Sequence, residues 1–366
     1  MNSLKLIFAA LLGGCATMDE PRDLLDEKIG SLLILGFEGK NSSDDSVQKI
    51  KRLSQRGDIV GTILFRHNIE SPDQLKKLTD SLKSPGFMIA VDQEGGKVQR
   101  LSPKNGFEDC PSALEMSKKS VKDAEAAYSK MAKLLKTYNI NVAYGPVVDI
   151  DYTPPSPVIG GLERSYGADV KTVVKYAKAY AGAMEKEGIL AVLKHFPGHG
   201  SAQGDTHEGL VDVTKTWREI ELEPYKLMLA DKSLHNLMVM TAHITHQKLD
   251  PNFPGTFSKS IMFDILRKGM KFEGPVVTDD LHMGAILKNY TIEESAEKAI
   301  KAGATFLLYS NNLLAAKGYD NFKISYEIPA QIIAHFKKKI REGDKDLEHA
   351  LDRAYKTSIK IRANLQ

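Results

Sequence analysis

The segment KHFPGHGSAQGDTH, residues 194–207, gathers one lysine, three histidines and one aspartate around glycines and a proline. Pro197 and the glycines exclude a regular helix, so we expect a loop. Asp205 and His207 stand two residues apart, and in a loop this spacing lets the carboxylate hold one imidazole nitrogen while the other stays free. Such a pair donates and accepts protons near neutral pH, which is the chemistry of general acid/base catalysis.

The chain around this segment alternates apolar, strand-like runs with amphipathic, helix-like runs. The expected strands are residues 32–39, 60–65, 87–92, 140–150, 189–196, 237–244, 275–281 and 305–311. The expected helices are residues 45–57, 71–83, 121–138, 169–188, 214–230, 258–269 and 291–303, with a final helix over 345–366. Strands that are each followed by a helix predict an α/β protein, a single-domain (β/α)₈ TIM-type barrel. A doubly wound open sheet is the rival fold, but no Gly-x-Gly-x-x-Gly turn follows the first expected strand.

Reactive side chains stand where the expected strands end. Asp92 ends the third strand, Lys194 and His195 end the fifth, and Asp279 ends the seventh. In this barrel fold the loops after the strands meet at one rim. Carboxylates and bases gathered there require partners or a function, because buried charge is costly. The sequence therefore predicts an active site at the carboxyl ends of the strands.

Five motifs carry a resemblance to a known family: DQEGGKVQR, PVIG with a following RSYG, KHFPGHG with a following DTH, MTAHI, and VVTDDLHMGAI. Together they resemble the family 3 glycoside hydrolases. More narrowly, they resemble the single-domain bacterial β-N-acetylhexosaminidases that release N-acetylglucosamine from peptidoglycan fragments. The resemblance spans about residues 24–340. It implies an exo-acting, retaining enzyme that forms a covalent glycosyl-enzyme and uses no cofactor or metal ion.

The resemblance also implies roles for individual residues. Asp279 matches the nucleophile, His207 the general acid/base, and Asp205 the partner that orients the histidine. The residues that match sugar-binding positions are Asp92, Arg100, Arg164, Lys194 and His195. These roles agree with the chemistry, because an ionised carboxylate attacks a sugar only if a second group protonates the leaving oxygen. Supporting roles are expected for Asp280, His199, His243, His246 and His282.

Four alternatives stay open on the sequence alone. A histidine acid/base leaves the site less anionic than the usual pair of carboxylates, so an anionic acceptor such as phosphate could replace water in a phosphorolytic enzyme. Related barrels also cleave plain glucosides, which makes a β-glucosidase a second alternative. A metallohydrolase would use His195, His199, Asp205, His207 and an aspartate at a strand end as ligands. A lipid-anchored sugar-binding protein without turnover is the fourth.

The first residues, MNSLKLIFAALLGGC, resemble a bacterial lipoprotein signal. We expect residues 1–14 to be the signal peptide, Cys15 to be acylated, residues 15–25 to form a tether and 26–366 to form the catalytic domain. The apolar run is shorter than the ~20 residues that a transmembrane helix needs. The pattern predicts a lipid-anchored protein of the cell envelope, with a membrane and a carbohydrate as its partners.

The net charge of +3, from 50 basic and 47 acidic residues without a basic block, argues against a nucleic acid partner. If Cys15 carries lipid, Cys110 is the other of the 2 cysteines, and a single thiol forms no intrachain disulfide. The stability of the fold must therefore come from its core.

Overall fold

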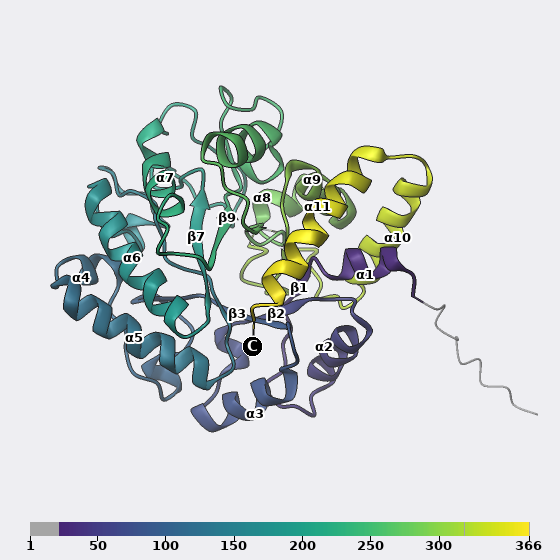
Figure 1. Cartoon of the computed structure of the whole chain (residues 1–366), viewed down its shortest axis with the longest axis horizontal. Helices are drawn as coiled ribbons and strands as arrows, with labels where there is room; N and C mark the ends of the chain where they lie inside the picture. Colours follow the sequence, from purple (N-terminus) through teal and green to yellow (C-terminus); the bar gives the residue numbers. More distant parts are fainter. Residues whose placement is uncertain (1–21, 318, 366) are drawn as a thin grey trace, which may run out of the picture.

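The computed structural model describes residues 22–317 and 319–365. Its centre is a sheet of eight parallel strands surrounded by helices (Figure 1). The strands are β1 (Leu33–Leu35), β2 (Gly61–Leu64), β3 (Met88–Val91), β6 (Val142–Ala143), β7 (Leu190–Phe196), β9 (Leu237–Thr241), β11 (Val276–Val277) and β12 (Leu307–Tyr309). Their order is β11, β9, β7, β6, β3, β2, β1, β12, and a parallel bridge between Val277 and Phe306 joins the two ends of this order. The predicted barrel is confirmed, because each expected strand contains one of these observed strands.

Helices surround the strands, and most of them cover the outside of the barrel (Figure 1). They are α1 (Leu24–Gly30), α2 (Asp45–Arg56), α3 (Pro72–Leu82), α4 (Ala113–Ser117), α5 (Val121–Thr137), α6 (Val170–Lys186), α7 (Glu223–Leu229), the π-helical η6 (Ser260–Gly269), α8 (Gly284–Leu287), α9 (Ile292–Ala302), α10 (Ile328–Arg341) and α11 (Lys345–Arg362). Local sequence explains where several begin. The Ser71 hydroxyl accepts a hydrogen bond from the backbone N–H of Gln74 at the start of α3. Thr291 and Glu294 form a capping box at the start of α9.

One expected helix is much shorter than its pattern suggested. The helix expected over residues 214–230 is reduced to the short η4 (Glu219–Leu222) and α7. The backbone N–H of Thr214 donates to the Asp212 carboxylate at 2.8 Å, which makes a turn instead of a helix start. The indole N–H of Trp217 donates to the Pro197 carbonyl at 3.2 Å, so this segment is held by the loop after β7.

The folded domain also begins earlier than expected. Leu24 and Leu25, assigned to the tether of residues 15–25, lie in α1, whose first turn is capped by the Asp23 carboxylate. Arg22 pairs with Asp58 just before this helix. The expected signal peptide and Cys15 lie outside the described residues.

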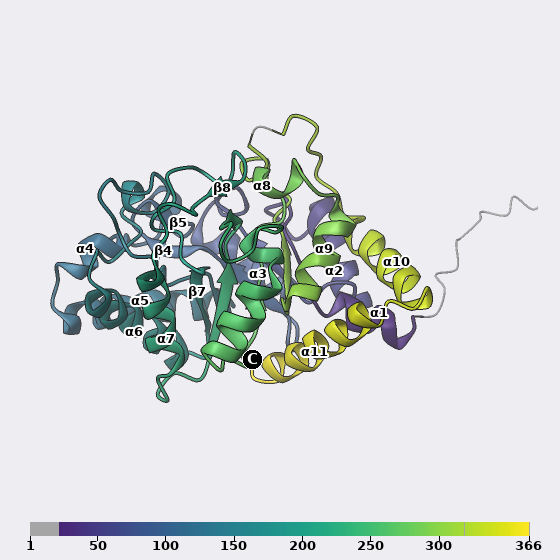
Figure 2. The ribbon, with the colours of Figure 1, turned by 90° about the horizontal axis from the view of Figure 1, so that it is seen from above.

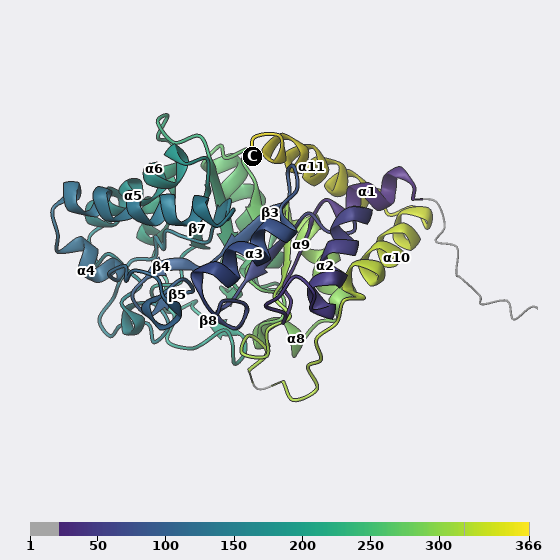
Figure 3. The same ribbon diagram turned by 90° about the horizontal axis from the view of Figure 1, so that it is seen from below.

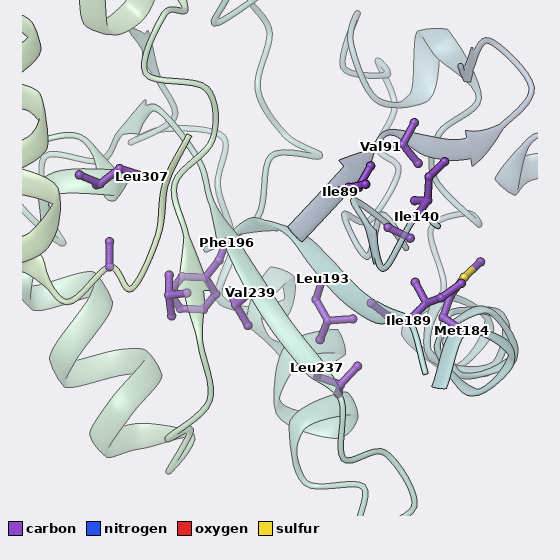
Figure 4. Packing of buried hydrophobic residues seen from close by; sticks show 14 of the residues in the cluster. Ile89, Val91, Ile140, Met184, Ile189, Leu193, Phe196, Leu237, Val239 and Leu307 are labelled. Atoms are coloured by element: carbon purple, nitrogen blue, oxygen red, sulfur yellow. The ribbon is translucent and has the colours of Figure 1, made fainter. Parts of the chain in front are cut away.

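Two apolar layers stabilise the barrel, because successive side chains of a strand point to opposite sides of a sheet. In β7, Leu190 and Val192 belong to the layer inside the barrel, whereas Ala191 and Leu193 belong to the layer under the helices. Figure 4 shows part of this outer layer, in which Leu193 lies beside Val239, its register partner on β9. Burial on both sides accounts for the nearly continuous apolar runs in the sequence.

The two ends of the barrel carry different structures. Figures 2 and 3 show α8 and β8 (Val211–Asp212) at one end and α11 at the other. The connections after the strands also contain the β4 (Gln93–Gly95) and β5 (Val98–Gln99) hairpin, as well as β10 (Ile244–Thr245), which pairs with β8. Among the described residues, no helix combines the length and the apolar character that a membrane crossing requires.

Candidate active site

A cavity of about 510 Å³ lies at the carboxyl ends of the strands. It brings together every side chain that the sequence predicted to bind a sugar or react with it. These are Asp92, Arg100, Arg164, Lys194, His195, Asp205, His207 and Asp279. His199 and Asp280, for which supporting roles were expected, line the same cavity.

The strand period explains why several of these side chains face the cavity. Val192 lies in the inner layer of the barrel, and Lys194 follows it two residues later on β7. Ala90 on β3 and Val277 on β11 also belong to the inner layer, and Asp92 and Asp279 follow them at the same interval. The polar side chains of the cavity floor therefore lie on the same side of the strands as the apolar side chains that fill the barrel.

A network of buried charges forms one wall of the cavity. The Lys194 ammonium lies 2.9 Å from Asp92 and 2.6 Å from Glu94. The guanidinium of Arg100 donates to Asp92 at 2.8 Å. Arg164 donates two hydrogen bonds to the Glu94 carboxylate, at 2.8 and 2.9 Å. An ammonium group has three N–H donors, so Lys194 keeps one for a ligand.

These contacts set the charges of the wall. Burial alone would raise the pKa of the Asp92 carboxyl, but Lys194 and Arg100 outweigh burial and hold it well below its usual range. Burial alone would also raise the pKa of the Glu94 carboxyl, but the positive charges of Arg164 and Lys194 outweigh burial and lower it. Both carboxylates are therefore ionised at neutral pH, and each holds cations whose remaining donors suit the hydroxyl and carbonyl oxygens of a sugar.

Glu94 was not among the expected site residues. It lies two positions after Asp92 in an extended segment, an interval that places both carboxylates on the same side. The two-residue spacing from Asp92 was therefore the feature of the sequence that could have indicated Glu94.

His195 has a defined tautomer in this site. Its Nδ1 lies 2.7 Å from the Asp149 carboxylate and its Nε2 lies 3.3 Å from the Arg164 guanidinium. A guanidinium only donates, so Nε2 accepts and the proton sits on Nδ1. Asp149 also accepts the backbone N–H groups of His195 and, at 2.8 Å, of His199. Asp149 thereby anchors the loop after β7.

The predicted pair of Asp205 and His207 forms in the structure. The carboxylate lies 2.7 Å from the histidine Nδ1 and accepts the backbone N–H of the same residue at 2.9 Å. The hydrogen bond from His207 lowers the pKa of Asp205 to about 2. Burial alone would lower the pKa of His207, but the hydrogen bond and the negative charge of Asp205 raise it above its usual value. The Nε2 atom is left for a ligand in the cavity.

Asp279 follows β11 and carries a negative charge at neutral pH. Burial would raise the pKa of its carboxyl, but His195 and His243 outweigh burial and lower it. The backbone N–H of Asp280 donates to the Asp279 carboxylate at 2.8 Å. A buried, ionised carboxylate beside donors is the state that a nucleophile requires.

The neighbouring Asp280 holds the local backbone. Its carboxylate accepts the backbone N–H groups of His282 and Ser310, each at 3.0 Å. Burial raises its pKa to about 6. His243 spans the same region, with Nδ1 at 2.7 Å from the Thr256 hydroxyl and Nε2 at 3.0 Å from the Asp280 carbonyl. These contacts are structural.

Two histidines of the rival metal site have protein partners. His195 contacts Asp149 and Arg164, and His207 contacts Asp205. In the part of the chain that the structure describes, no group of three or more His, Cys, Asp or Glu side chains is arranged to hold a metal ion.

Both the sequence and the fold are similar to those of known proteins. A β-hexosaminidase of Nitrosomonas eutropha is 36% identical over 265 residues, which cover 69% of this chain and 74% of that protein. The structure of a β-N-acetylhexosaminidase from Beutenbergia cavernae matches with a TM-score of 0.79 and 25% identity, over 92% of this chain and 98% of the other. A family 3 β-N-acetylglucosaminidase from Paenibacillus matches with a TM-score of 0.78 and 29% identity, over 94% of this chain and 63% of the other.

The family resemblance seen in the motifs is confirmed by a match to a whole-domain model. The model described as the glycosyl hydrolase family 3 N terminal domain covers residues 24–341, which includes the barrel and every residue of the candidate site. The chain therefore belongs to glycosyl hydrolase family 3.

Proposed function

We propose that this protein is a retaining, exo-acting β-N-acetylhexosaminidase that hydrolyses terminal β-linked N-acetylglucosamine. The observation that carries the proposal is the pairing of two groups on one cavity: an ionised carboxylate at Asp279 and a proton donor at His207 with a raised pKa. The similarity to the β-N-acetylhexosaminidase and β-N-acetylglucosaminidase structures supports the N-acetyl preference.

The reaction follows from the two groups. Asp279 attacks the anomeric carbon while His207 gives a proton to the leaving oxygen, and the sugar becomes bound to the enzyme as an ester. In the second half, neutral His207 takes a proton from water, which attacks the same carbon and releases Asp279. Asp205 keeps the imidazole oriented throughout, because it holds the Nδ1 atom.

The charged wall binds the non-reducing sugar. Lys194, Asp92 and Arg100 offer donors and acceptors for hydroxyl groups, and Arg164 with His195 extends this surface. Buried polar groups of this kind discriminate strongly between sugars, because a ligand that lacks a matching group leaves them unpaired. We expect an N-acetylglucosamine residue to satisfy them and a plain glucoside to be a poor substrate.

Phosphorolysis is the second candidate. One of the two reacting groups is a histidine where the usual pair has a second carboxyl, and Arg100 and Lys194 add positive charge to the cavity. These features also suit an attacking phosphate in the second step. The two reactions differ only in that step, so the product distinguishes them.

The natural substrate that we propose is a peptidoglycan fragment, and the proposed location is the cell envelope, with acylation at Cys15. The lipoprotein-like residues MNSLKLIFAALLGGC support the location. Metabolic labelling with a radioactive fatty acid tests the anchor. Label on the wild type but not on Cys15→Ser is the expected result, and label that persists on the variant would contradict it.

Product analysis tests the activity. Residues 22–366 of the chain are incubated with p-nitrophenyl β-N-acetylglucosaminide, with and without phosphate, beside Asp279→Ala and His207→Ala. The proposal expects free N-acetylglucosamine in both buffers and its loss with Asp279→Ala. N-acetylglucosamine 1-phosphate as the main product would identify a phosphorylase. No cleavage of this substrate or of the plain glucoside would favour a sugar-binding protein.

A further inference from the structure

The loop that carries His207 is bonded to the segment that follows the nucleophile. The backbone N–H of Gly284 donates to the His207 carbonyl at 3.2 Å, and that of Ala285 donates to the Thr206 carbonyl at 3.1 Å. Both donors belong to the first turn of α8, which begins five residues after Asp279. Figure 2 shows α8 at the end of the barrel that carries β8, the strand that follows this loop.

Side chains reinforce the same junction. The Lys288 ammonium donates to the Glu208 carbonyl at 2.6 Å, and Lys317 pairs with the Glu208 carboxylate at 2.5 Å. The Lys317 and Glu208 side chains are both more than half exposed, so this ion pair contributes little to global stability. It ties the position next to His207 to the loop after β12.

Gly284 leaves no room for a side chain at this junction. A Cβ atom added there would lie 2.3 Å from the His207 carbonyl oxygen and 3.0 Å from the Lys317 carbonyl oxygen. Both neighbours are backbone atoms, so no side chain can rotate away to relieve the contact. Any residue larger than glycine must push the His207 backbone away from α8 or move α8 itself.

The segment between Asp279 and α8 is held to the barrel and resists such a movement. The backbone N–H of Leu281 donates to Leu308 on β12 at 2.9 Å, and that of Met283 donates to the Asp280 carbonyl at 2.9 Å. A side chain at position 284 therefore displaces the less constrained partner, which is the loop that carries His207.

From these contacts we propose that Gly284 is a positioning residue for the general acid/base. Its missing side chain lets the first turn of α8 hold the His207 loop in a fixed place relative to Asp279. These contacts thereby fix the proton donor relative to the nucleophile, although 72 positions separate the two residues in the sequence. The inference rests on the proposed function, since it assigns Gly284 a part in the protonation step.

The test compares two substrates that differ in their need for protonation. In N,N′-diacetylchitobiose the leaving group is the second N-acetylglucosamine, a poor leaving group that needs a proton from the acid, whereas the 2,4-dinitrophenolate of 2,4-dinitrophenyl β-N-acetylglucosaminide departs without one. The ratio kcat/KM reports the first half-reaction, in which the glycosyl-enzyme forms. Gly284→Ala is expected to lower kcat/KM for the disaccharide by about 100-fold and for the dinitrophenyl substrate by less than about 5-fold, the pattern expected when general acid catalysis is lost.

Gly209→Ala is the matched control. Gly209 lies two residues after His207 on the same loop, and an added Cβ there meets no atom within 4 Å. This variant is expected to keep both kcat/KM values within about 2-fold of the wild type, because an unhindered surface substitution changes little.

A second variant keeps the inference testable if Gly284→Ala does not fold. Glu208→Gln removes the charge that pairs with Lys317 while the fold stays intact. We expect Glu208→Gln to lower kcat/KM for the disaccharide by less than Gly284→Ala does, and to leave kcat/KM for the dinitrophenyl substrate unchanged.

The outcomes separate the inference from the proposed function. Equal losses for both substrates, or no loss for either, would overturn the positioning role of Gly284. A wild type that cleaves neither substrate would overturn the proposed function and, with it, this inference.

Discussion

The Lys194 ammonium lies 2.6 Å from the Glu94 carboxylate, and only 2% and 5% of the two side chains is exposed to solvent. Desolvated charges of this kind are tolerated only when each finds its partner. The same carboxylate receives two hydrogen bonds from Arg164. Glu94 therefore neutralises two buried cations of the sugar-binding wall at once.

Glu94→Gln tests this role through stability. The amide keeps the shape but removes the charge, which leaves Lys194 and Arg164 inadequately paired, and we expect the free energy of unfolding to fall by about 3–5 kcal/mol. Urea denaturation followed by circular dichroism measures it. Glu348→Gln, which removes a charge from the exposed pair with Lys345, is the control and should leave the midpoint unchanged. Equal midpoints for wild type and Glu94→Gln would contradict the account.

Asp205→Asn tests the proton donor through the pH profile. His207 acts as an acid only while it is protonated, and Asp205 raises its pKa. Removing the carboxylate charge lowers that pKa, so the alkaline limb of kcat/KM for N,N′-diacetylchitobiose should move to lower pH. The acidic limb, set by protonation of Asp279 below the usual carboxyl range, should stay in place. An unchanged alkaline limb would mean that another group donates the proton.

Glu221→Gln tests a buried carboxyl behind the loop. Glu221 accepts the Gly200 N–H at 3.1 Å, is 1% exposed, and burial raises its pKa from 4.5 to about 7. The folded state keeps a proton that the unfolded state has lost, so this group costs up to about 3 kcal/mol of stability as pH rises from 4.5 to 7. The melting temperature of Glu221→Gln should exceed that of the wild type at pH 8 but not at pH 4. A difference independent of pH would contradict the raised pKa.

The barrel was predictable from the sequence because its determinants are local. Apolar runs of strand length recur at regular intervals, and residues such as Ser71 and Thr291 mark the helix starts. The helix expected over residues 214–230 was wrong, because the interaction of Trp217 with Pro197 overrides the local pattern. The helix α10 was missed, although Ile328, Ile332 and Phe336, which it buries, recur at helical spacing.

The candidate site was only partly predictable from the sequence. The residues expected to touch substrate share the cavity because strand ends converge in a barrel. Glu94, Gly284 and the anchoring role of Asp149 were not predicted, because each acts on a partner that is distant in the sequence. The sequence shows which groups can react, whereas only the packed structure shows which groups hold them in place.

The most direct test of the account is intact-mass spectrometry of the His207→Ala variant mixed with 2,4-dinitrophenyl β-N-acetylglucosaminide. This substrate reacts without an acid, whereas release of the sugar from the enzyme needs the missing base, so the covalent intermediate should accumulate. The account predicts a mass increase of one N-acetylglucosaminyl group, mapped to the peptide that contains Asp279 and absent from the variant that also carries Asp279→Ala. An adduct on a residue other than Asp279 would contradict this mechanism. So would turnover of the substrate, without any adduct, by the variant that carries both His207→Ala and Asp279→Ala.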